Sequence, residues 1–310
     1  MSDARDGAGA AASHAGRRYL IACLTVVLAG FILSLGVFCI RGASASDAWQ
    51  YLFWRAIGFT GALVAVASLR DHRNPLVQVK SLSAFGWVAA VAMAVSQVTF
   101  ISAVKITTFA DVFFLCSLAP LLAAMLARPL LGERIGWLVL VAIALALAGV
   151  YVMTGGGLAT GNWLGWALSI ASAVAFAAYS LATRGSSAGD LDAALIAVGL
   201  MAGAASLAAV LLQGLPVWPR TADVLIALAH GTLILSAGLF LYGQGSRDVP
   251  GVTFTMLAQA EAVFAPIWGY LYFAENPTRG TVIGGAMILA AVVLQAAAGD
   301  RGGPRQPQGQ

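Results

Sequence analysis

Long apolar segments separated by short polar stretches run along this chain from near Arg18 to near Gly299. Each segment has about the 20 residues that a helix needs to cross a bilayer, and none alternates as a membrane β-strand does. The pattern therefore predicts an all-α polytopic membrane protein with ten transmembrane helices. The predicted spans are Tyr19–Ile40, Trp49–Leu69, Leu82–Val104, Thr108–Ala127, Gly136–Met153, Trp163–Thr183, Leu191–Leu212, Asp223–Tyr242, Pro250–Phe273 and Pro277–Ala298.

One block of this pattern occurs twice. Thr107–Met153 and Val249–Leu294 each contain an apolar helix, a short charged hairpin and a second apolar helix, and they stay in register when Glu133 is placed on Glu275. We therefore predict two five-helix repeats, residues 19–153 and 163–298, joined by a linker at 154–162 and flanked by disordered tails at 1–18 and 299–310. Because five is odd, the second repeat is inverted, and the interface between the repeats is the expected substrate site.

Composition agrees with a membrane location, since only 10% of the 310 residues are charged, against about 25% in soluble domains. Twelve Lys and Arg residues lie in tails and loops that an inside N-terminus places in the cytoplasm, and four lie outside: Arg41, Lys105, Arg220 and Arg279. This bias predicts a bacterial inner-membrane protein with both termini cytoplasmic. The net charge of +4 follows from the same bias, so we expect no nucleic-acid partner.

The first span has features of a secretory signal peptide, with two arginines before the apolar run and an Ala-Ser-Ala sequence after it. The apolar run is longer than a usual signal-peptide core, and its removal would leave four spans in one repeat against five in the other. We therefore expect a retained helix. Cys23, Cys39 and Cys116 fall within spans without CxxC spacing, which favours buried free thiols.

Several short motifs carry a family resemblance. They are Pro120 inside the fourth span, Leu131-Gly132-Glu133, Ala148-Gly149-Val150, Ala260-Glu261-Ala262, Phe273-Ala274-Glu275 and Pro277. With these motifs the chain resembles the drug/metabolite transporter superfamily, in its EamA-type ten-helix group, over nearly its whole length. The resemblance implies a carrier that does not use ATP, and a site lined by the third, fourth, sixth, eighth and ninth spans. One departure is Ala262, where the family often has proline, with Pro266 a turn later.

Two charged side chains lie deep inside predicted spans, where ionisable groups are costly and are candidates for function. Arg55 lies about two turns into the second span; it can hold a substrate carboxylate, or extend outward to a headgroup or to Asp47. Glu261 lies near the middle of the ninth span. It can act as a proton site, as a counter-charge to an amine, or as a partner of Arg55 or His230.

Four further residues have one functional and one structural interpretation each. Asp111 is a candidate coupling group, but Thr108-x-x-Asp111 before an apolar run is also a helix-capping pattern. His230 is either a proton relay or a hydrogen-bonded interior histidine. Pro120 and Pro266 free the carbonyls of the residues four before them, so they mark either hinges and binding groups or tolerated bends.

Polar and aromatic residues form stripes on three spans. The sixth carries Trp166, Ser169, Ser172, Phe176, Tyr179 and Thr183, the ninth carries Thr255, Gln259, Pro266 and Tyr270, and the third carries Ser96, Gln97 and Thr99. An apolar, aromatic cavity with a few hydroxyl and amide groups suits amino acids with large apolar side chains. The alternative is hydrogen bonding between packed helices. From these stripes we take Ser96, Gln97, Trp166, Tyr179 and Gln259, together with Arg55 and His230, as candidate substrate-binding residues.

These observations lead to one functional hypothesis and two alternatives. The hypothesis is a secondary transporter that exports apolar or aromatic amino acids or related metabolites by alternating access; the export direction and the amino-acid class rest on the resemblance. The alternatives are a proton-coupled exporter of cationic drugs and a non-transport membrane enzyme or signalling subunit. The sequence contains no P-loop, HExxH or GxSxG motif, so we expect no enzyme activity, cofactor or metal.

The expected partners are a small-molecule substrate, membrane lipid and, as a candidate coupling ion, the proton. Gly199-x-x-x-Gly203 and Gly280-x-x-x-Gly284 allow helices to approach closely. Packing inside one bundle accounts for both motifs, so a monomer is favoured over a dimer.

Overall fold

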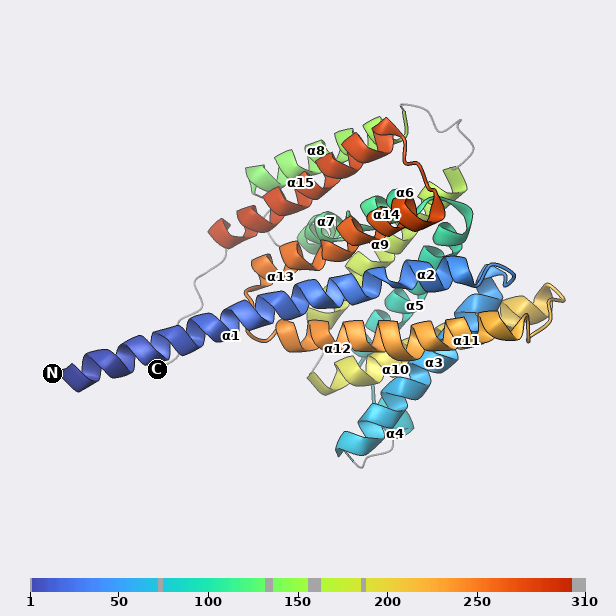
Figure 1. The fold of residues 1–310 in the computed structure, drawn as a ribbon, viewed down its shortest axis with the longest axis horizontal. Helices are drawn as coiled ribbons and strands as arrows, with labels where there is room; N and C mark the ends of the chain where they lie inside the picture. The colour runs from blue at the N-terminus through green and yellow to red at the C-terminus, as the bar shows by residue number, and fades with distance from the viewer. Residues whose placement is uncertain (1, 72–74, 132–135, 156–162, 185–187, 303–310) are drawn as a thin grey trace.

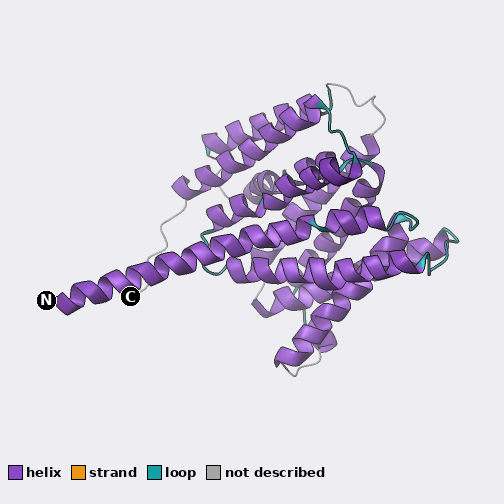
Figure 2. Ribbon diagram, in the orientation of Figure 1, coloured by secondary structure: helices purple, strands orange, loops and turns teal. Residues whose placement is uncertain are grey.

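A computed structural model of the chain describes residues 2–71, 75–131, 136–155, 163–184 and 188–302, and these are helical apart from short connections (Figures 1 and 2). The first half contains α1 (Ser2–Ser34), α2 (Gly36–Gly42), α3 (Ala48–Asp71), α4 (Pro75–Lys80), α5 (Ala84–Ile106), α6 (Phe109–Cys116), α7 (Ala119–Leu131) and α8 (Trp137–Met153). The second half contains α9 (Trp163–Arg184), α10 (Ala188–Leu212), α11 (Thr221–Ala229), the π-helical turn η1 (His230–Leu235), α12 (Ser236–Gly245), α13 (Gly251–Ala258), α14 (Ala260–Phe273) and α15 (Arg279–Gly302).

Eight helical segments in the described part of the chain are long and apolar enough to cross a membrane. Their bounds lie within a few residues of eight of the predicted spans. The predicted fifth span is the 17-residue helix α8, which is shorter than the others. The predicted ninth span is divided into α13 and α14 by a break at Gln259. The chain is a multi-pass membrane protein, and the count of ten spans stays a prediction.

The packing of the helices follows the predicted duplication. The second span packs on the seventh (α3 on α10), the fourth on the ninth (α6 on α14) and the fifth on the tenth (α8 on α15). The third packs on the sixth (α5 on α9), and the eighth packs in the same way on the first (α12 on α1). If each span of the first half is exchanged with its equivalent in the second half, the same set of packed pairs results. This is what a two-fold relation between duplicated halves requires.

The antiparallel packing of α8 and α15 shows that these two equivalent helices start at opposite ends of the bundle. Gly149 of α8 lies against Gly284, whereas Val152 lies against Gly280, so one helix ascends where the other descends (Figure 1). The start of α8 is therefore next to the end of α15, at the opposite end from residues 274–278. Gly132, Glu133 and Arg134 of the first hairpin lie outside the described residues.

Gly284 is predicted to be essential for this packing. A Cβ at Gly284 would overlap the carbonyl oxygen of Gly149 and lie 2.8 Å from Met153 Cβ. We expect Gly284→Ala to destabilise the folded protein by about 1–3 kcal/mol through overpacking. Thermal unfolding in detergent measures this effect. Gly61→Ala is the matched control, because a Cβ at Gly61 meets nothing within 4 Å, and its unfolding temperature should stay level or rise.

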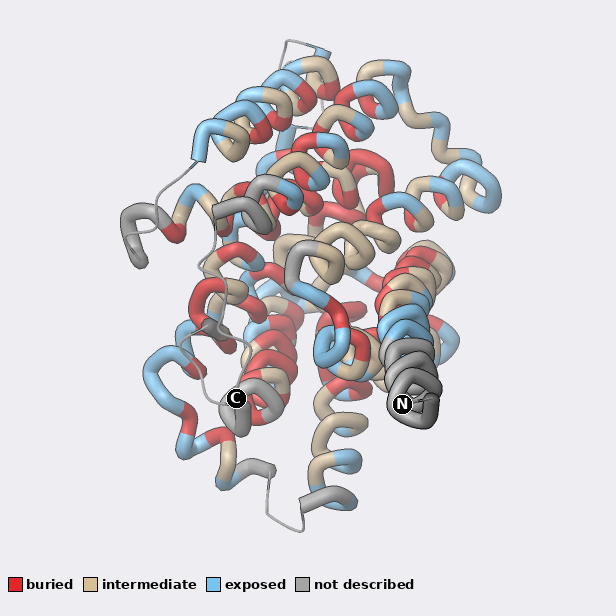
Figure 3. Tube along the Cα trace, turned by 90° about the vertical axis from the view of Figure 1, so that its left-hand side faces the viewer, coloured by how far each residue is buried: buried red, intermediate tan, exposed pale blue. Residues whose placement is uncertain are grey.

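Burial separates the interior of the bundle from its outer faces. Buried residues gather where helices face each other, and exposed residues form the outward faces (Figure 3). Large apolar side chains are common on these faces; Leu212, for example, is 88% exposed. A water-soluble protein rarely exposes apolar surface on this scale, and lipid covers it in a membrane protein.

The structure differs from the sequence expectations at both termini and at one helix start. Helix α1 begins at Ser2 and α15 continues to Gly302, where disordered tails were expected; the Ala-rich sequence of residues 8–15 favours helix. Asn276 directly before Pro277 is a typical helix-cap pattern, but Asn276 does not cap the last helix. The cap is Thr278, whose hydroxyl accepts a hydrogen bond from the Thr281 amide at 3.0 Å.

Candidate functional site

The fourth and ninth spans are both interrupted, at equivalent positions. Helix α6 ends at Cys116 and α7 starts at Ala119, while α13 ends at Ala258 and α14 starts at Ala260. The shift of 142 residues that places Glu133 on Glu275 also places Ser117 on Gln259, so both breaks fall at the same point of the repeat. Discontinuous helices near the middle of a membrane leave backbone polar groups available and commonly mark transporter binding sites.

The two prolines lie differently with respect to the breaks. Pro120 lies in the first turn of α7, directly after the first break. Pro266 lies inside α14, which continues through it, and the span is interrupted at Gln259 instead; a hinge at Pro266 stays a prediction. No residue pattern signalled this break, because glutamine tolerates a helix. The Tyr242 hydroxyl stabilises it by donating to the Ala258 carbonyl at 3.2 Å.

Glu261 lies in the first turn of α14, immediately after the second break. Its carboxyl group has no hydrogen bond or ion pair with any residue that the structure describes. Gly30 of α1 lies against its backbone, because a Cβ there would be 3.1 Å from the Glu261 nitrogen and 3.2 Å from the Tyr242 hydroxyl. The carboxyl group also interacts electrostatically with the Cys116 thiol and the Tyr242 hydroxyl.

Polar groups from the other predicted lining helices reach the same region. The Cys116 thiol donates to the Ser169 carbonyl at 3.6 Å and lies beside Ser172. Ser172 and Ser96 exchange hydrogen bonds of 3.0–3.1 Å between α9 and α5. We refer to Ser96, Cys116, Ser172, Tyr242, Gln259 and Glu261 as the central polar cluster. It draws on the third, fourth, sixth, eighth and ninth spans.

The sequence reasoning missed two members of this cluster and gave one a different role. Cys116 was interpreted only as a buried thiol, and Tyr242 sits at the predicted end of a span, where tyrosine is common. Ser96 was a substrate-binding candidate, but its hydroxyl is held by Ser172 in the contact between α5 and α9. The Gln259 side chain stands in the break and has no hydrogen-bond partner among the described residues.

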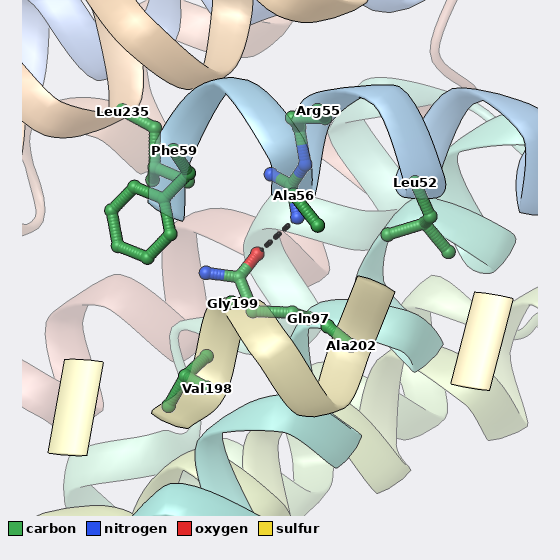
Figure 4. Close-up of a pocket in the computed structure, with 9 residues that line it drawn as sticks. All are labelled: Leu52, Arg55, Ala56, Phe59, Gln97, Val198, Gly199, Ala202 and Leu235. Atoms are coloured by element: carbon green, nitrogen blue, oxygen red, sulfur yellow. Dashed lines mark hydrogen bonds between the residues drawn. The ribbon is translucent and has the colours of Figure 1, made fainter. Parts of the chain in front are cut away.

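A second group of polar side chains lies between α3, α5 and η1. The Arg55 guanidinium donates to Gln97 Oε1 at 2.5 Å (Figure 4). The Tyr51 hydroxyl is 2.5 Å from His230 Nδ1. Tyr51 and Arg55 are one turn apart on α3, and a Cβ at Gly231 would overlap the Arg55 carbonyl. Three predicted residues, Arg55, Gln97 and His230, are thus brought together.

Arg55 does not extend to the surface, as one interpretation of the sequence proposed. The residue is 5% exposed and does not contact Asp47, which accepts a hydrogen bond from the Trp49 amide instead. The pairing of Glu261 with Arg55 or His230 is likewise absent from the described residues. The cavity beside Arg55 is about 10 Å³, which is room for about one water molecule. This conformation is therefore closed around Arg55.

Asp111 has a structural position. Thr108 caps α6 by accepting a hydrogen bond from the Asp111 amide at 3.2 Å, which confirms the predicted cap. The carboxylate accepts from the Thr107 hydroxyl at 3.2 Å and from the Thr281 hydroxyl at 3.0 Å. Both oxygens are thus engaged, and Asp111 joins the fourth span to the tenth; its role as a coupling group stays a prediction.

The predicted stripe on the sixth span does not line a single cavity. Trp166 packs among Leu115, Leu118 and Ile288, and its indole nitrogen has no hydrogen-bond partner in the described part of the chain. Tyr179 packs on the other side of α9, against residues of α5 and α10. The two aromatic side chains, expected together, therefore lie in different clusters.

A polar network closes the end of the bundle that holds residues 43–47 and 274–278, which the charge bias assigns to the outside. Arg41 pairs with Glu275 and also donates to the Thr107 carbonyl at 3.1 Å. The other Glu275 oxygen accepts from the Phe109 amide at 2.8 Å. Asp223 accepts from the amides of Ala45 and Ser46. We call this set the outer network; the first, third, fourth, eighth and ninth spans meet in it.

Comparisons with known proteins agree with this architecture. The model of the EamA-like transporter family matches residues 20–155 and again residues 163–296. An uncharacterized transporter of Archaeoglobus fulgidus is 28% identical over 273 residues, which cover 87% of this chain and 93% of that protein. A crystal structure of another protein superposes with a TM-score of 0.63 over 90% of this chain and 98% of the other. At 18% identity, that likeness concerns the fold alone.

Proposed function

The chain belongs to the EamA-like transporter family, and from this membership we propose that it is a secondary carrier which exports amino acids or related small metabolites by alternating access. The family gives the transporter function. The substrate class, the direction and the mechanism are our proposal, as is the placement in a bacterial inner membrane with both termini in the cytoplasm.

One observation carries the proposal: a carboxyl group without a basic partner stands where five spans from both halves meet. Glu261 supplies that charge, and the hydroxyl groups of Tyr242 and Ser172 lie nearby. A substrate ammonium group can pair with the carboxylate, and such charge-assisted bonds are strong away from water. Aromatic residues between α1 and α14, including Phe31, Phe264 and Trp268, offer surface for an apolar side chain.

The arrangement of closed and broken elements supports alternating access. The outer network closes one end of the bundle, while the breaks beside Ser117 and Gln259 divide the fourth and ninth spans near the central polar cluster. Half-helices joined by a break can tilt separately, because no continuous hydrogen-bond ladder holds them straight. We propose that release to the predicted outside requires the outer network to open while these half-helices move.

Counterflow in liposomes tests the transport proposal. Proteoliposomes loaded with unlabelled phenylalanine should accumulate external labelled phenylalanine at least several-fold faster than protein-free liposomes. A panel of other amino acids defines the specificity, and an imposed pH gradient separates facilitated exchange from proton coupling. If the protein moves no amino acid in the panel faster than empty liposomes do, the proposed substrate class is wrong.

A second candidate function is proton-coupled export of cationic drugs, and the same carboxyl group favours it. Glu261 can release a proton when a cation binds and recover it when the cation leaves. This candidate predicts that adding a cationic substrate to the purified protein at fixed pH releases protons, and that Glu261→Gln abolishes the release. Amino-acid counterflow without such a signal would favour the first proposal.

A further inference from the structure

Arg55 is a buried cation without an acidic partner. It is 5% exposed, and its side chain donates to the neutral amide of Gln97. The ion pairs among the described residues, Arg18 with Asp248 and Arg41 with Glu275, do not include it. A buried charge is costly unless an opposite charge compensates it, so an unpaired arginine inside a membrane bundle marks a place where an anion would be stabilised.

The surroundings of Arg55 form a pocket between the two halves. The wall from the first half includes Leu52, Phe59 and Gln97, and the wall from the second half includes Val198, Gly199 and Leu235 (Figure 4). Apart from Arg55 and Gln97, the lining is apolar. A guanidinium group has five N–H donors in a planar fork that matches a carboxylate, and Gln97 Oε1 is its one side-chain acceptor among the described residues.

A second polar atom beside the pocket also has no partner. The Thr60 hydroxyl is shut off from solvent and makes no hydrogen bond with the described residues. It lies against Gly199, where a Cβ would overlap the hydroxyl oxygen. Buried hydroxyl groups are normally hydrogen-bonded. Because Gly199 also lines the pocket, this unsatisfied hydroxyl adds a polar group at the edge of the Arg55 site.

The pocket is separate from the central polar cluster. Gly30 of α1 lies against Glu261, whereas Gly36, six residues further along, lies against the ring of His230, next to Arg55. At 1.5 Å per residue these contacts are about 9 Å apart along the helix. The charges of one α-amino acid are much closer together, which favours Glu261 and Arg55 as two separate subsites.

We propose that Arg55, together with Gln97, forms a second subsite that binds the carboxylate of the transported substrate, on the predicted outer side of the central polar cluster. This inference rests on the proposed transport function and narrows its substrates to carboxylates. The subsite is closed here, with room for about one water molecule, so binding requires α3 and α10 to separate. A substrate leaving Glu261 is then held at Arg55 before release.

A set of half-substrates tests the subsite without relying on transport. The purified protein in nanodiscs of zwitterionic lipid is titrated with 3-phenylpropionate, which has only the carboxylate, and with phenylethylamine, which has only the amine. Arg55→Met should weaken 3-phenylpropionate binding at least tenfold and leave phenylethylamine within about twofold. Glu261→Gln should do the reverse. Arg220→Met, at an exposed arginine of the same predicted end, is the matched control and should change neither.

Stability distinguishes this role from a purely structural one. Arg55→Met removes a buried charge that has no acidic partner. The unfolding temperature of the ligand-free variant should therefore stay unchanged or rise, because a binding residue of this kind lowers stability. Arg55→Lys keeps the charge but loses the fork, so it should bind 3-phenylpropionate with intermediate affinity. Undiminished 3-phenylpropionate binding by Arg55→Met overturns the proposal, as does a lack of binding by the unmodified protein.

A lipid phosphate is the competing occupant, and the same assay separates it. If nanodiscs with anionic lipid weaken 3-phenylpropionate binding both to the unmodified protein and to the Arg220→Met control, lipid occupies the Arg55 site and the proposal is wrong. Equal affinities in both lipids support it. A failure of the liposome counterflow would leave these binding results unchanged, so the two proposals fail independently.

Discussion

Replacing Glu261 by Gln is expected to slow amino-acid counterflow about 10- to 100-fold while the protein remains folded. The carboxylate is proposed to pair with the substrate ammonium group, and hydrogen bonds to charged groups contribute about 1.5–3 kcal/mol. At 1.4 kcal/mol per factor of ten, their loss corresponds to this range. Because Glu261 has no polar partner among the described residues, glutamine leaves no buried charge unpaired, and the unfolding temperature should be level or higher.

The measurement compares initial rates of phenylalanine counterflow at equal protein density in the membrane. Asp248→Asn is the matched control, since it makes the same acid-to-amide change at an exposed position paired with Arg18. That variant should keep its full rate. Normal counterflow by Glu261→Gln would show that the carboxyl group does not contact the substrate, and the central polar cluster would lose its proposed role.

The positions of the spans could be predicted because they depend on local properties of the sequence. A run of about 20 apolar residues has little alternative to a transmembrane helix, since lipid offers no partner for free backbone groups. For the same reason the Thr108 cap was predictable, because it involves neighbours three residues apart. The duplication added the pairing of helices, which the packing of α3 on α10 and α8 on α15 now shows.

Contacts between distant residues were not predictable from one sequence. Arg41 and Glu275 are 234 positions apart, and each was interpreted through its immediate neighbours, as a loop charge and as a helix-end charge. From the sequence, the expected partner of Arg55 was a substrate carboxylate, a lipid headgroup or Asp47. In the structure, packing of α3 against α5 brings Gln97 within hydrogen-bonding distance of Arg55. Helical periodicity indicates the face of a side chain, but it does not identify the helix that faces it.

The break at Gln259 shows a different limit. Sequence rules for helix interruption rely on proline and glycine, and they directed attention to Pro266, which α14 accommodates. The interruption lies at the position equivalent to the break beside Ser117 in the first repeat. The second repeat has no proline there, because the residue equivalent to Pro120 is Ala262. A proline would leave a carbonyl of the helix without its backbone donor. Here the Tyr242 hydroxyl donates to the Ala258 carbonyl and so stabilises a similar interruption without a proline. Such compensation is visible only in the assembled bundle.

Breaking the outer network at Glu275 is the change expected to affect stability most among the charged positions. Glu275 is 12% exposed and Arg41 is 29% exposed, so their pair lies between the surface and buried classes. Glu275→Gln removes the ion pair and leaves Arg41 without an acidic partner, at a cost of about 2 kcal/mol. For a chain of this size the unfolding temperature should fall by about 3 °C. Arg18→Gln, which breaks an exposed ion pair, is the control and should cause no measurable change.

The same substitution should also open the predicted outer end. The network joins the first, third and ninth spans through Arg41, Thr107 and Glu275, so its loss favours conformations in which these spans separate. Cys39 lies on α2 next to Arg41 and is a native probe. In a background with Cys23→Ala and Cys116→Ala, labelling of Cys39 by a membrane-impermeant maleimide added outside should be several-fold faster in Glu275→Gln. If neither the unfolding temperature nor the labelling rate changes, the outer network does not hold this end closed, and opening must depend on the apolar contacts around Phe109 and Phe273.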